Sequence, residues 1–331
     1  MRVLLYARPG LGSLLAGDAV QARATAAALR KLGVEADLAE EDLPDPGDYD
    51  LVHLFNLIPI ESTYTAYRAV RAAGKPFVLS PVFWDPTEYL TKTGLSSLFA
   101  WWERTMPLRR EVLRAAALIL PNGQGEVECL ERFFGALPPH RVVPNGVDPT
   151  LFFTPGREDR RDGPHVLCVG RITPRKNQLA LLNALRGTGV PVAFVGPVND
   201  FAYYRVCRTA AWPGVSFRPA VFGRRLADLY RAAAVHVLPS WYETPGLASL
   251  EAAACGCRVV TTDRGTVREY FGEGALYCPP DDPEAIRAAV LAALAAPPPA
   301  GLAEMVRARY TWEEAARATK KGYEIALGRP A

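Results

Sequence analysis

The chain has 331 residues, 49% of them hydrophobic and 22% charged, which is enough apolar material for two packed domains. Its formal net charge of only +3 argues against nucleic acid as the main partner. No apolar stretch approaches the length of a membrane span.

Targeting and cysteine patterns are also informative. The apolar run at residues 1–6 is too short for a signal peptide and leads into Arg8-Pro9-Gly10. Most of the six cysteines lie in apolar stretches, no C-x-x-C pair occurs, and the four histidines are scattered. Neither a disulfide framework nor a zinc site is expected, and we predict a soluble cytoplasmic protein.

The first half of the chain alternates short apolar runs with helical patterns, which is typical of a parallel sheet covered by helices. A long Ala-rich helix is expected to end before Gly33, in the position favoured by a helix-terminating glycine. The expected strands cover residues 3–7, 34–39, 51–55, 75–81 and 118–122, and the expected helices include 19–32 and 123–134.

The stretch 95–117 is rich in aromatic and basic residues, and Pro107 is expected to break it. An aromatic and basic helix is suited to docking on an anionic membrane surface, here the inner face of the membrane. The alternative is that the aromatic rings fill the domain core. The residues concerned are Phe99, Trp101, Trp102, Arg104, Arg109, Arg110 and Arg114.

The second half repeats the alternation after a charged linker at 156–164 bounded by glycine and proline. The expected strands cover residues 165–170, 192–195, 214–218, 234–238 and 258–262, and the expected helices cover 178–185, 226–234, 284–296 and 311–327.

The most informative stretch of the second half follows the apolar run 234–238. The chain turns at Pro245-Gly246 and enters a helix rich in Ala and Leu. Glu251 lies at the edge of its apolar stripe, where an ionised and unpaired carboxylate would be costly. Glu243 lies on the preceding loop, at the carboxyl end of a strand, where open α/β sheets bind ligands. The stretch therefore predicts an anion site at a helix N-terminus, with a carboxylate on either side.

A second loop places two cations at the same kind of position. The strand 165–170 leads into Arg171 and Lys176. The planar guanidinium of Arg171 can donate two parallel hydrogen bonds to a phosphate, and the Lys176 ammonium acts as a point charge beside it. Arg175 lies between them and can be solvated.

Three segments carry a resemblance to a known family. They are Val143-Pro-Asn-Gly-Val-Asp148, the pattern G-R-x-x-x-x-K at 170–176, and P-S-x-x-E-x-x-G-L-x-x-L-E-A-x-A-x-G at 239–256. Together they resemble the retaining glycosyltransferases of family 4. The resemblance implies a GT-B fold, in which two doubly wound parallel-sheet (Rossmann-like) domains face a cleft. It places an acceptor domain at 1–149 with the final helix 311–331, and a donor domain at 150–310.

The implied activity is transfer of a sugar from a UDP- or GDP-linked nucleotide sugar to an acceptor hydroxyl with retention of configuration. The acceptor is expected to be a glycan, a lipid-linked molecule or a small molecule. No cofactor or metal is expected, because no D-x-D ends a strand in the second half and Asp281-Asp282 is expected to cap a helix. A nucleotide-sugar epimerase of similar fold and a non-catalytic nucleotide-sugar binding protein are the alternatives.

The resemblance also implies roles for particular residues. Arg171, Lys176 and Glu243 are expected to act in catalysis, and Glu251 is expected to accept hydrogen bonds from the ribose hydroxyls. Apart from the resemblance, the residue types make Asp18, Asp85 and His53 candidates for the acceptor site. The alternative for Asp85 is a solvated loop carboxylate, and for His53 it is a satisfied core histidine, which is the commoner case. The expected donor-binding set is Gly17, Arg171, Lys176, Pro219, Glu243, Thr244, Gly246, Leu247 and Glu251.

Overall fold

The computed structural model describes residues 1–7, 17–153, 165–297 and 299–329. It divides the chain into two compact units, which are unit 1 (residues 1–146 and 312–331) and unit 2 (residues 147–311). The domain boundaries expected from the sequence were 149/150 and 310/311. The expected linker at 156–164 lies outside the described residues.

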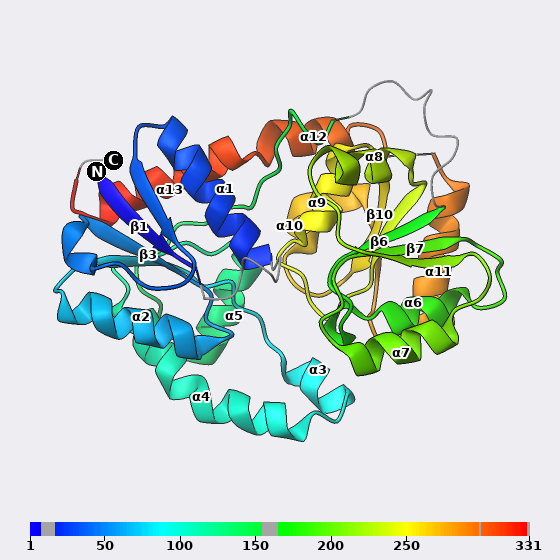
Figure 1. The fold of residues 1–331 in the computed structure, drawn as a ribbon, viewed down its shortest axis with the longest axis horizontal. Helices are drawn as coiled ribbons and strands as arrows, with labels where there is room; N and C mark the ends of the chain where they lie inside the picture. The colour runs from blue at the N-terminus through cyan, green and yellow to red at the C-terminus, as the bar shows by residue number, and fades with distance from the viewer. Residues whose placement is uncertain (8–16, 154–164, 298, 330–331) are drawn as a thin grey trace. The chain divides into compact units, whose positions relative to one another are not determined.

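Unit 1 is built on a parallel sheet with the strand order β2-β1-β3-β4-β5 (Figure 1). Its inner strands are buried along almost their whole length because helices cover both faces. Helices α1 and α13 cover one face, and α2, α4 and α5 cover the other. The strands are β1 (Arg2–Tyr6), β2 (Glu35–Ala39), β3 (Leu51–Phe55), β4 (Phe77–Ser80) and β5 (Leu118–Ile119). The helices are α1 (Gly17–Lys31), α2 (Ile60–Ala72), α3 (Thr87–Lys92), α4 (Ser96–Ala115), α5 (Gln124–Phe134) and α13 (Trp312–Ala326).

The predicted break at Pro107 is wrong, because helix α4 continues through this residue. A proline removes one backbone donor, here the usual partner of the Glu103 carbonyl one turn earlier. Glu103 and Pro107 are both exposed, so this carbonyl lies on the solvent-facing side of the helix. Side chains bond to other carbonyls of the same helix. Thr105 Oγ1 donates to the Trp101 carbonyl at 2.6 Å, and Arg109 Nη1 donates to the Trp102 carbonyl at 3.3 Å.

The aromatic side chains of α4 face the core of unit 1. Trp102 is buried, and the guanidinium of the fully buried Arg109 lies 4.2 Å from its ring centroid. Arg109 Nε and Nη2 also donate to the carbonyls of Leu57 and Ile58, both at 2.8 Å. This packing favours the core alternative for the aromatic stretch. No helix among the described residues has the length and apolarity needed to cross a membrane.

Unit 2 is built on a six-stranded parallel sheet with the order β11-β10-β9-β6-β7-β8. Helices α8, α9, α10 and α12 cover one face, and α6, α7 and α11 cover the other. The strands are β6 (Val166–Val169), β7 (Val192–Val195), β8 (Val215–Arg218), β9 (Val235–Leu238), β10 (Arg258–Thr262) and β11 (Leu276–Cys278). The helices are α6 (Gln178–Leu185), α7 (Phe201–Ala210), α8 (Arg224–Ala232), α9 (Leu247–Ala254), α10 (Val267–Phe271), α11 (Pro283–Ala295) and α12 (Leu302–Arg309).

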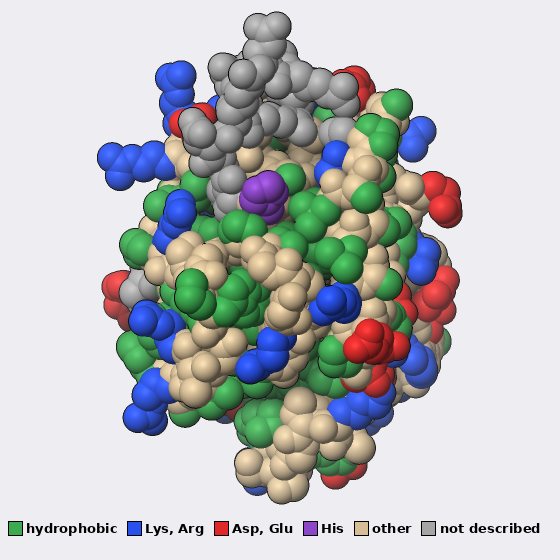
Figure 2. Space-filling model, turned by 90° about the vertical axis from the view of Figure 1, so that its right-hand side faces the viewer, with side chains coloured by type: hydrophobic (Ala, Val, Ile, Leu, Met, Phe, Trp, Pro, Cys, Tyr) green, Lys and Arg blue, Asp and Glu red, His purple; other side chains and the backbone are tan. Residues whose placement is uncertain are grey.

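The two doubly wound parallel sheets confirm the predicted fold class. On the face that Figure 2 draws, Lys and Arg side chains are scattered among hydrophobic and uncharged ones. The described residues on this face therefore form no continuous basic stripe of the kind that binds nucleic acid.

Candidate functional site

Two neighbouring loops at the carboxyl edge of the unit 2 sheet carry the residues predicted for the donor site. Strands β6 and β9 are adjacent in the sheet, so the loop after β6 (170–177) lies beside the loop after β9 (239–246). Parallel pairing brings both loops to the same edge, although they are far apart in the sequence.

Hydrogen bonds join the two loops directly. The Trp241 N–H donates to the Arg175 carbonyl at 3.0 Å, and Arg175 Nη1 donates to the Tyr242 carbonyl at 2.9 Å. Asn177 Nδ2 donates to the Pro239 carbonyl at 3.0 Å. The solvated alternative for Arg175 therefore does not hold, because its guanidinium fastens one loop to the other.

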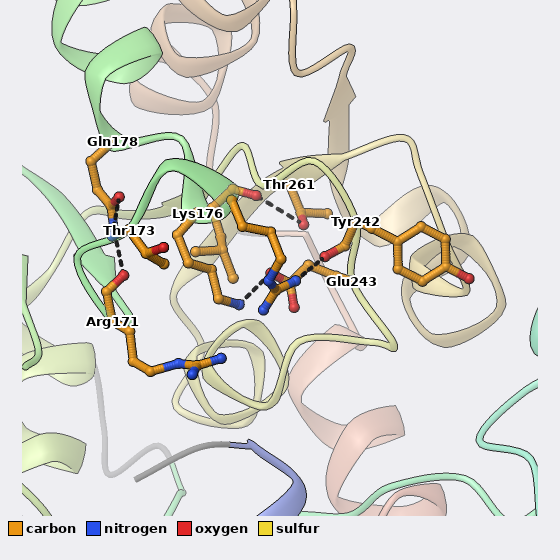
Figure 3. Close-up of polar contacts among 9 residues, drawn as sticks. Arg171, Thr173, Lys176, Gln178, Tyr242, Glu243 and Thr261 are labelled. Carbon is orange, nitrogen blue, oxygen red and sulfur yellow. Dashed lines mark hydrogen bonds and ion pairs between the residues drawn. The ribbon is translucent and has the colours of Figure 1, made fainter. Parts of the chain in front are cut away.

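Lys176 and Glu243 form an ion pair between the same loops (Figure 3). Their side chains are only 12% and 6% exposed, respectively. Burial lowers the pKa of Lys176 to about 8, and the charge of Glu243 opposes this shift. Burial alone would raise the pKa of Glu243, but the nearby Lys176 and Arg175 outweigh it and hold that pKa below its usual range. The pair is therefore ionised near neutral pH.

The backbone of Glu243 is held by a third loop, which follows β10. The Glu243 N–H donates to the Arg264 carbonyl at 3.4 Å, and the Thr266 N–H donates to the Glu243 carbonyl at 3.1 Å. Gly265 has a φ of +95°, and a Cβ there would lie 2.0 Å from the Glu243 carbonyl oxygen. Only glycine permits this close approach, so the loop fixes the position of Glu243.

Arg171 adds a second cation beside Lys176. Gln178 Nε2 donates to the Arg171 carbonyl at 2.8 Å, and this bond anchors the start of the loop after β6 (Figure 3). The charge of Arg171 contributes to lowering the pKa of Lys176, so the guanidinium and the ammonium share one electrostatic environment. A guanidinium and an ammonium together are suited to binding a diphosphate.

Helix α9 begins at Leu247, directly after Gly246, which has a φ of +83°. The first N–H groups of a helix have no acceptor within the helix, and they lie at the positive end of its dipole. A Cβ at Gly246 would lie 3.0 Å from Glu243 Oε2, so the turn before α9 packs closely against the carboxylate. Thr244 lies between them and is partly exposed.

Glu251 lies in the second turn of α9 and is partly buried. Its Oε2 accepts a hydrogen bond from the Tyr230 hydroxyl at 3.1 Å. Burial raises the pKa of Glu251 to about 7, and the Tyr230 hydroxyl opposes the shift. The carboxylate therefore has a defined partner within the protein.

The expected donor set also includes two residues that do not belong to these loops. Pro219 follows β8 and is exposed, at the same edge of the unit 2 sheet. Gly17 is the first residue of α1 in unit 1, where it is exposed and a Cβ would contact nothing within 4 Å.

Comparison with known proteins identifies the family. The model of the family described as glycosyl transferases group 1 matches residues 163–296. The chain is 31% identical over 330 residues to a D-inositol 3-phosphate glycosyltransferase from Acidothermus cellulolyticus, covering 88% of this chain and 70% of that protein. The chain belongs to the group 1 glycosyltransferases.

A second relative and a solved structure are also similar to this glycosyltransferase. It is 32% identical over 231 residues to glycogen synthase from Mycobacterium tuberculosis, covering 64% of this chain and spanning 55% of the length of that relative. The solved structure of sucrose-phosphate synthase from Thermosynechococcus elongatus superposes with a TM-score of 0.82 at 20% identity, over 99% of both chains. This likeness confirms the GT-B fold, and the family match confirms the resemblance found in the sequence.

In unit 1 of this glycosyltransferase, Asp18 belongs to a buried polar cluster. Asp18 lies in the first turn of α1 and accepts a hydrogen bond from Asn56 Nδ2 at 2.6 Å. Asn56 follows β3 with a φ of +76°. Asn56 is not among the predicted site residues, although a polar residue that ends a buried strand could have indicated a role.

His53 and Asp85 are both hydrogen-bonded within unit 1. Both ring nitrogens of the buried His53 are hydrogen-bonded, to Tyr323 Oη at 2.7 Å and to Ser80 Oγ at 2.9 Å. Burial lowers the pKa of His53 to about 3, and these contacts favour the core-histidine alternative. Asp85 Oδ1 accepts hydrogen bonds from the Thr87 N–H and hydroxyl, at 2.9 and 2.6 Å.

Glu126 is a fully buried carboxylate that is not among the predicted site residues. Its oxygens accept hydrogen bonds from the backbone N–H groups of Phe83 at 2.8 Å and Asn122 at 2.7 Å. It thereby joins the loops after β4 and β5 at the carboxyl edge of the unit 1 sheet. In the described part of the chain, no group of three or more His, Cys, Asp or Glu side chains could hold a metal ion.

Proposed function

We propose that this glycosyltransferase moves a sugar from a UDP- or GDP-linked donor to an acceptor hydroxyl, with retention of configuration and without a divalent metal. The observation that carries the proposal is the group formed by Arg171, Lys176 and Glu243 at the carboxyl edge of the unit 2 sheet. Ligands bind at this edge in open α/β sheets. Two cations suit a diphosphate, and the adjacent carboxylate suits a sugar.

In the proposed reaction, the bond between the anomeric carbon and the diphosphate oxygen breaks while the acceptor oxygen bonds to that carbon. The acceptor proton passes to an oxygen of the departing phosphate, so no protein base is required. Negative charge grows on the diphosphate as its bond breaks. Lys176, Arg171 and the N-terminus of α9 stabilise this charge in the transition state more than in the bound donor.

The two carboxylates have different roles. Glu243 hydrogen-bonds to hydroxyls of the donor sugar and stabilises the positive charge that develops near the anomeric carbon. Glu251 accepts hydrogen bonds from the ribose hydroxyls. Lys176 exchanges part of its contact with Glu243 for the diphosphate, and the added negative charge raises its pKa again. The remaining donor contacts come from the segments around Gly17, Pro219, Thr244, Gly246 and Leu247.

The acceptor is proposed to contact unit 1, where Asp18 and Asn56 lie at the carboxyl edge of the sheet. The name of the relative from A. cellulolyticus includes an inositol phosphate, which supports a small-molecule acceptor bearing hydroxyl groups. A lipid-linked acceptor would instead require peripheral contact with the inner face of the membrane.

The test is proton NMR of the first product formed from a panel of UDP- and GDP-sugars with polyol and glycan acceptors, in excess EDTA. We expect release of the nucleoside diphosphate and a product that keeps the anomeric configuration of the donor. An inverted product would contradict retention. Free sugar without an acceptor product would indicate the epimerase alternative, and binding without turnover would indicate a non-catalytic binding protein.

A further inference from the structure

Tyr230, in helix α8, connects the core of unit 2 to the proposed ribose site. Its side chain is fully buried, yet its hydroxyl donates to Glu251 Oε2 at 3.1 Å. Buried tyrosine hydroxyls usually require a partner, and this one bonds to a carboxylate rather than to a backbone carbonyl. The bond joins α8 to α9, two helices that pack on the same face of the sheet.

The ring of Tyr230 is fixed by aromatic neighbours from two other segments. The Phe152 ring lies 6.2 Å from it at an interplanar angle of 62°, and the His236 ring lies 5.7 Å from it at 86°. His236 belongs to β9, the strand that leads into Glu243. The position of the hydroxyl is therefore set by the core of the unit.

We propose that Tyr230 is a positioning residue for the donor site, whose hydroxyl fixes the Glu251 carboxylate so that its remaining lone pairs accept hydrogen bonds from the ribose. The inference rests on the proposed function, in which Glu251 binds the ribose. A carboxylate offers about four acceptor sites, and Tyr230 occupies one of them. A carboxylate that is already held in place loses less side-chain freedom when the nucleotide binds.

The same hydroxyl also influences the charge of Glu251. Burial raises the pKa of Glu251, and the Tyr230 hydroxyl opposes the shift, so removing the hydroxyl should raise this pKa further. Burial raises the pKa of Tyr230 well above its usual value, so it remains a donor at all physiological pH values.

Charged groups from neighbouring helices act on a thiol of α9, as Glu251 itself does. Cys255, one turn further along α9, has a pKa of about 12 because of burial. The charges of Asp228 and Arg231 from α8 and of Arg307 from α12 act on this thiol. Among the described side chains, Tyr230 acts on the pKa of Glu251 through its hydrogen bond, which lowers that pKa.

The experiment compares two ligands that differ only at the ribose. Calorimetry measures the Kd of UDP, GDP or ADP, whichever binds most tightly, and of its 2′,3′-dideoxy form, between pH 5.5 and 9. The ratio of the two Kd values cancels the titration of the phosphates and of Lys176. In the wild type we expect the ribonucleotide to be preferred above pH 7, with the preference declining at lower pH as Glu251 becomes protonated.

Tyr230→Phe retains the ring and removes only the hydroxyl. We expect it to reduce the preference for the ribonucleotide at pH 7 by about fivefold or more, as for the loss of one ordinary hydrogen bond. The midpoint of the pH profile should also move to higher pH, which loss of packing alone would not cause. Tyr310→Phe is the matched control, because the Tyr310 hydroxyl donates to the backbone carbonyl of Glu269 at 3.1 Å.

A double variant separates the positioning role from a general effect on the fold. In a Glu251→Gln background, Tyr230→Phe should have little further effect on the preference. An undiminished effect in that background, or an unchanged ratio and midpoint in Tyr230→Phe alone, would overturn the inference while leaving the proposed function intact. A folded wild type that binds none of the three diphosphates would contradict the proposed function instead.

Discussion

The Lys176 ammonium and the Glu243 carboxylate form a buried ion pair between the loops that follow β6 and β9. Neither side chain is more than 12% exposed, so each charge has lost most of its contact with water. The attraction between the two opposite charges offsets this desolvation cost. The proposed reaction uses both groups, Lys176 on the diphosphate and Glu243 on the sugar. Substitutions at these positions therefore affect stability as well as catalysis, and the two effects can be separated.

The first prediction concerns Lys176→Met. This change leaves Glu243 buried without its partner, so we expect a loss of about 3–5 kcal/mol in the free energy of unfolding. It also removes a charge that stabilises the leaving group, so kcat should fall by about 10²–10³, by analogy with loss of one oxyanion donor. Chemical denaturation and steady-state kinetics measure the two effects.

Lys176→Met/Glu243→Gln is the control for this prediction. Neutralising both partners should restore much of the lost stability, because no unpaired charge remains buried. The value of kcat should remain low in the double variant. Recovery of kcat together with stability would show that Lys176 acts only through the fold.

The second prediction concerns the glycine that fixes Glu243. A Cβ at residue 265 would lie 2.0 Å from the Glu243 carbonyl oxygen, so Gly265→Ala must displace one of the two loops. We expect kcat/KM to fall by about tenfold or more, on the order of the loss caused by misplacing a positioned group.

Gly189→Ala is the matched control for Gly265→Ala. Gly189 also has a positive φ, of +70°, but a Cβ there would meet nothing within 4 Å. It should cost only the backbone strain, about 1 kcal/mol of stability, with kcat/KM unchanged. Equal kinetic effects of the two variants would contradict the positioning role of the loop after β10.

The third prediction is a pH dependence of stability due to Glu251. Its pKa is raised to about 7 in the folded protein, above its ordinary value of 4.5. A raised pKa means that the folded state binds the proton more tightly, so the stabilisation is complete below pH 4.5 and is lost as the pH rises through 7. The loss is at most about 3 kcal/mol, from the linkage between pKa and stability.

Glu251→Gln lacks this titration and should gain stability relative to the wild type as the pH rises from 5 to 8. Urea denaturation of both proteins across that range measures the difference. A constant difference in the free energy of unfolding would show that the pKa of Glu251 is not raised.

The sequence was sufficient to predict the fold class and the family. The strands at 51–55, 192–195 and 258–262 coincide with β3, β7 and β10, because buried parallel strands are continuous apolar runs bounded by turns. The pattern at 239–256, which indicated the family, also predicted the loop that carries Glu243 and the helix that carries Glu251. The functional roles of these residues stay predictions.

The partners of these residues could not be predicted from the sequence. Lys176 and Glu243 are 67 positions apart, and they meet only because β6 lies beside β9 in the sheet. Arg175 donates to a backbone carbonyl, a contact for which no residue type is diagnostic. Helix α4 continues through Pro107 because residues on both sides of it, such as Trp102 and Val112, are buried in the core of unit 1, a packing that the local pattern does not reveal.

The central claim is that unit 2 binds the diphosphate of a nucleotide sugar through Arg171 and Lys176 without a metal. Calorimetric titration of the wild type and of Arg171→Met with UDP, GDP and ADP in excess EDTA tests it most directly. We predict that at least one nucleoside diphosphate binds to the wild type in EDTA. Arg171→Met should weaken this binding by about tenfold, as for a lost charge-assisted contact. The affinity for the corresponding nucleoside should be unchanged by the substitution. Binding that appears only when manganese is added, or equal affinity in the wild type and Arg171→Met, would contradict the claim.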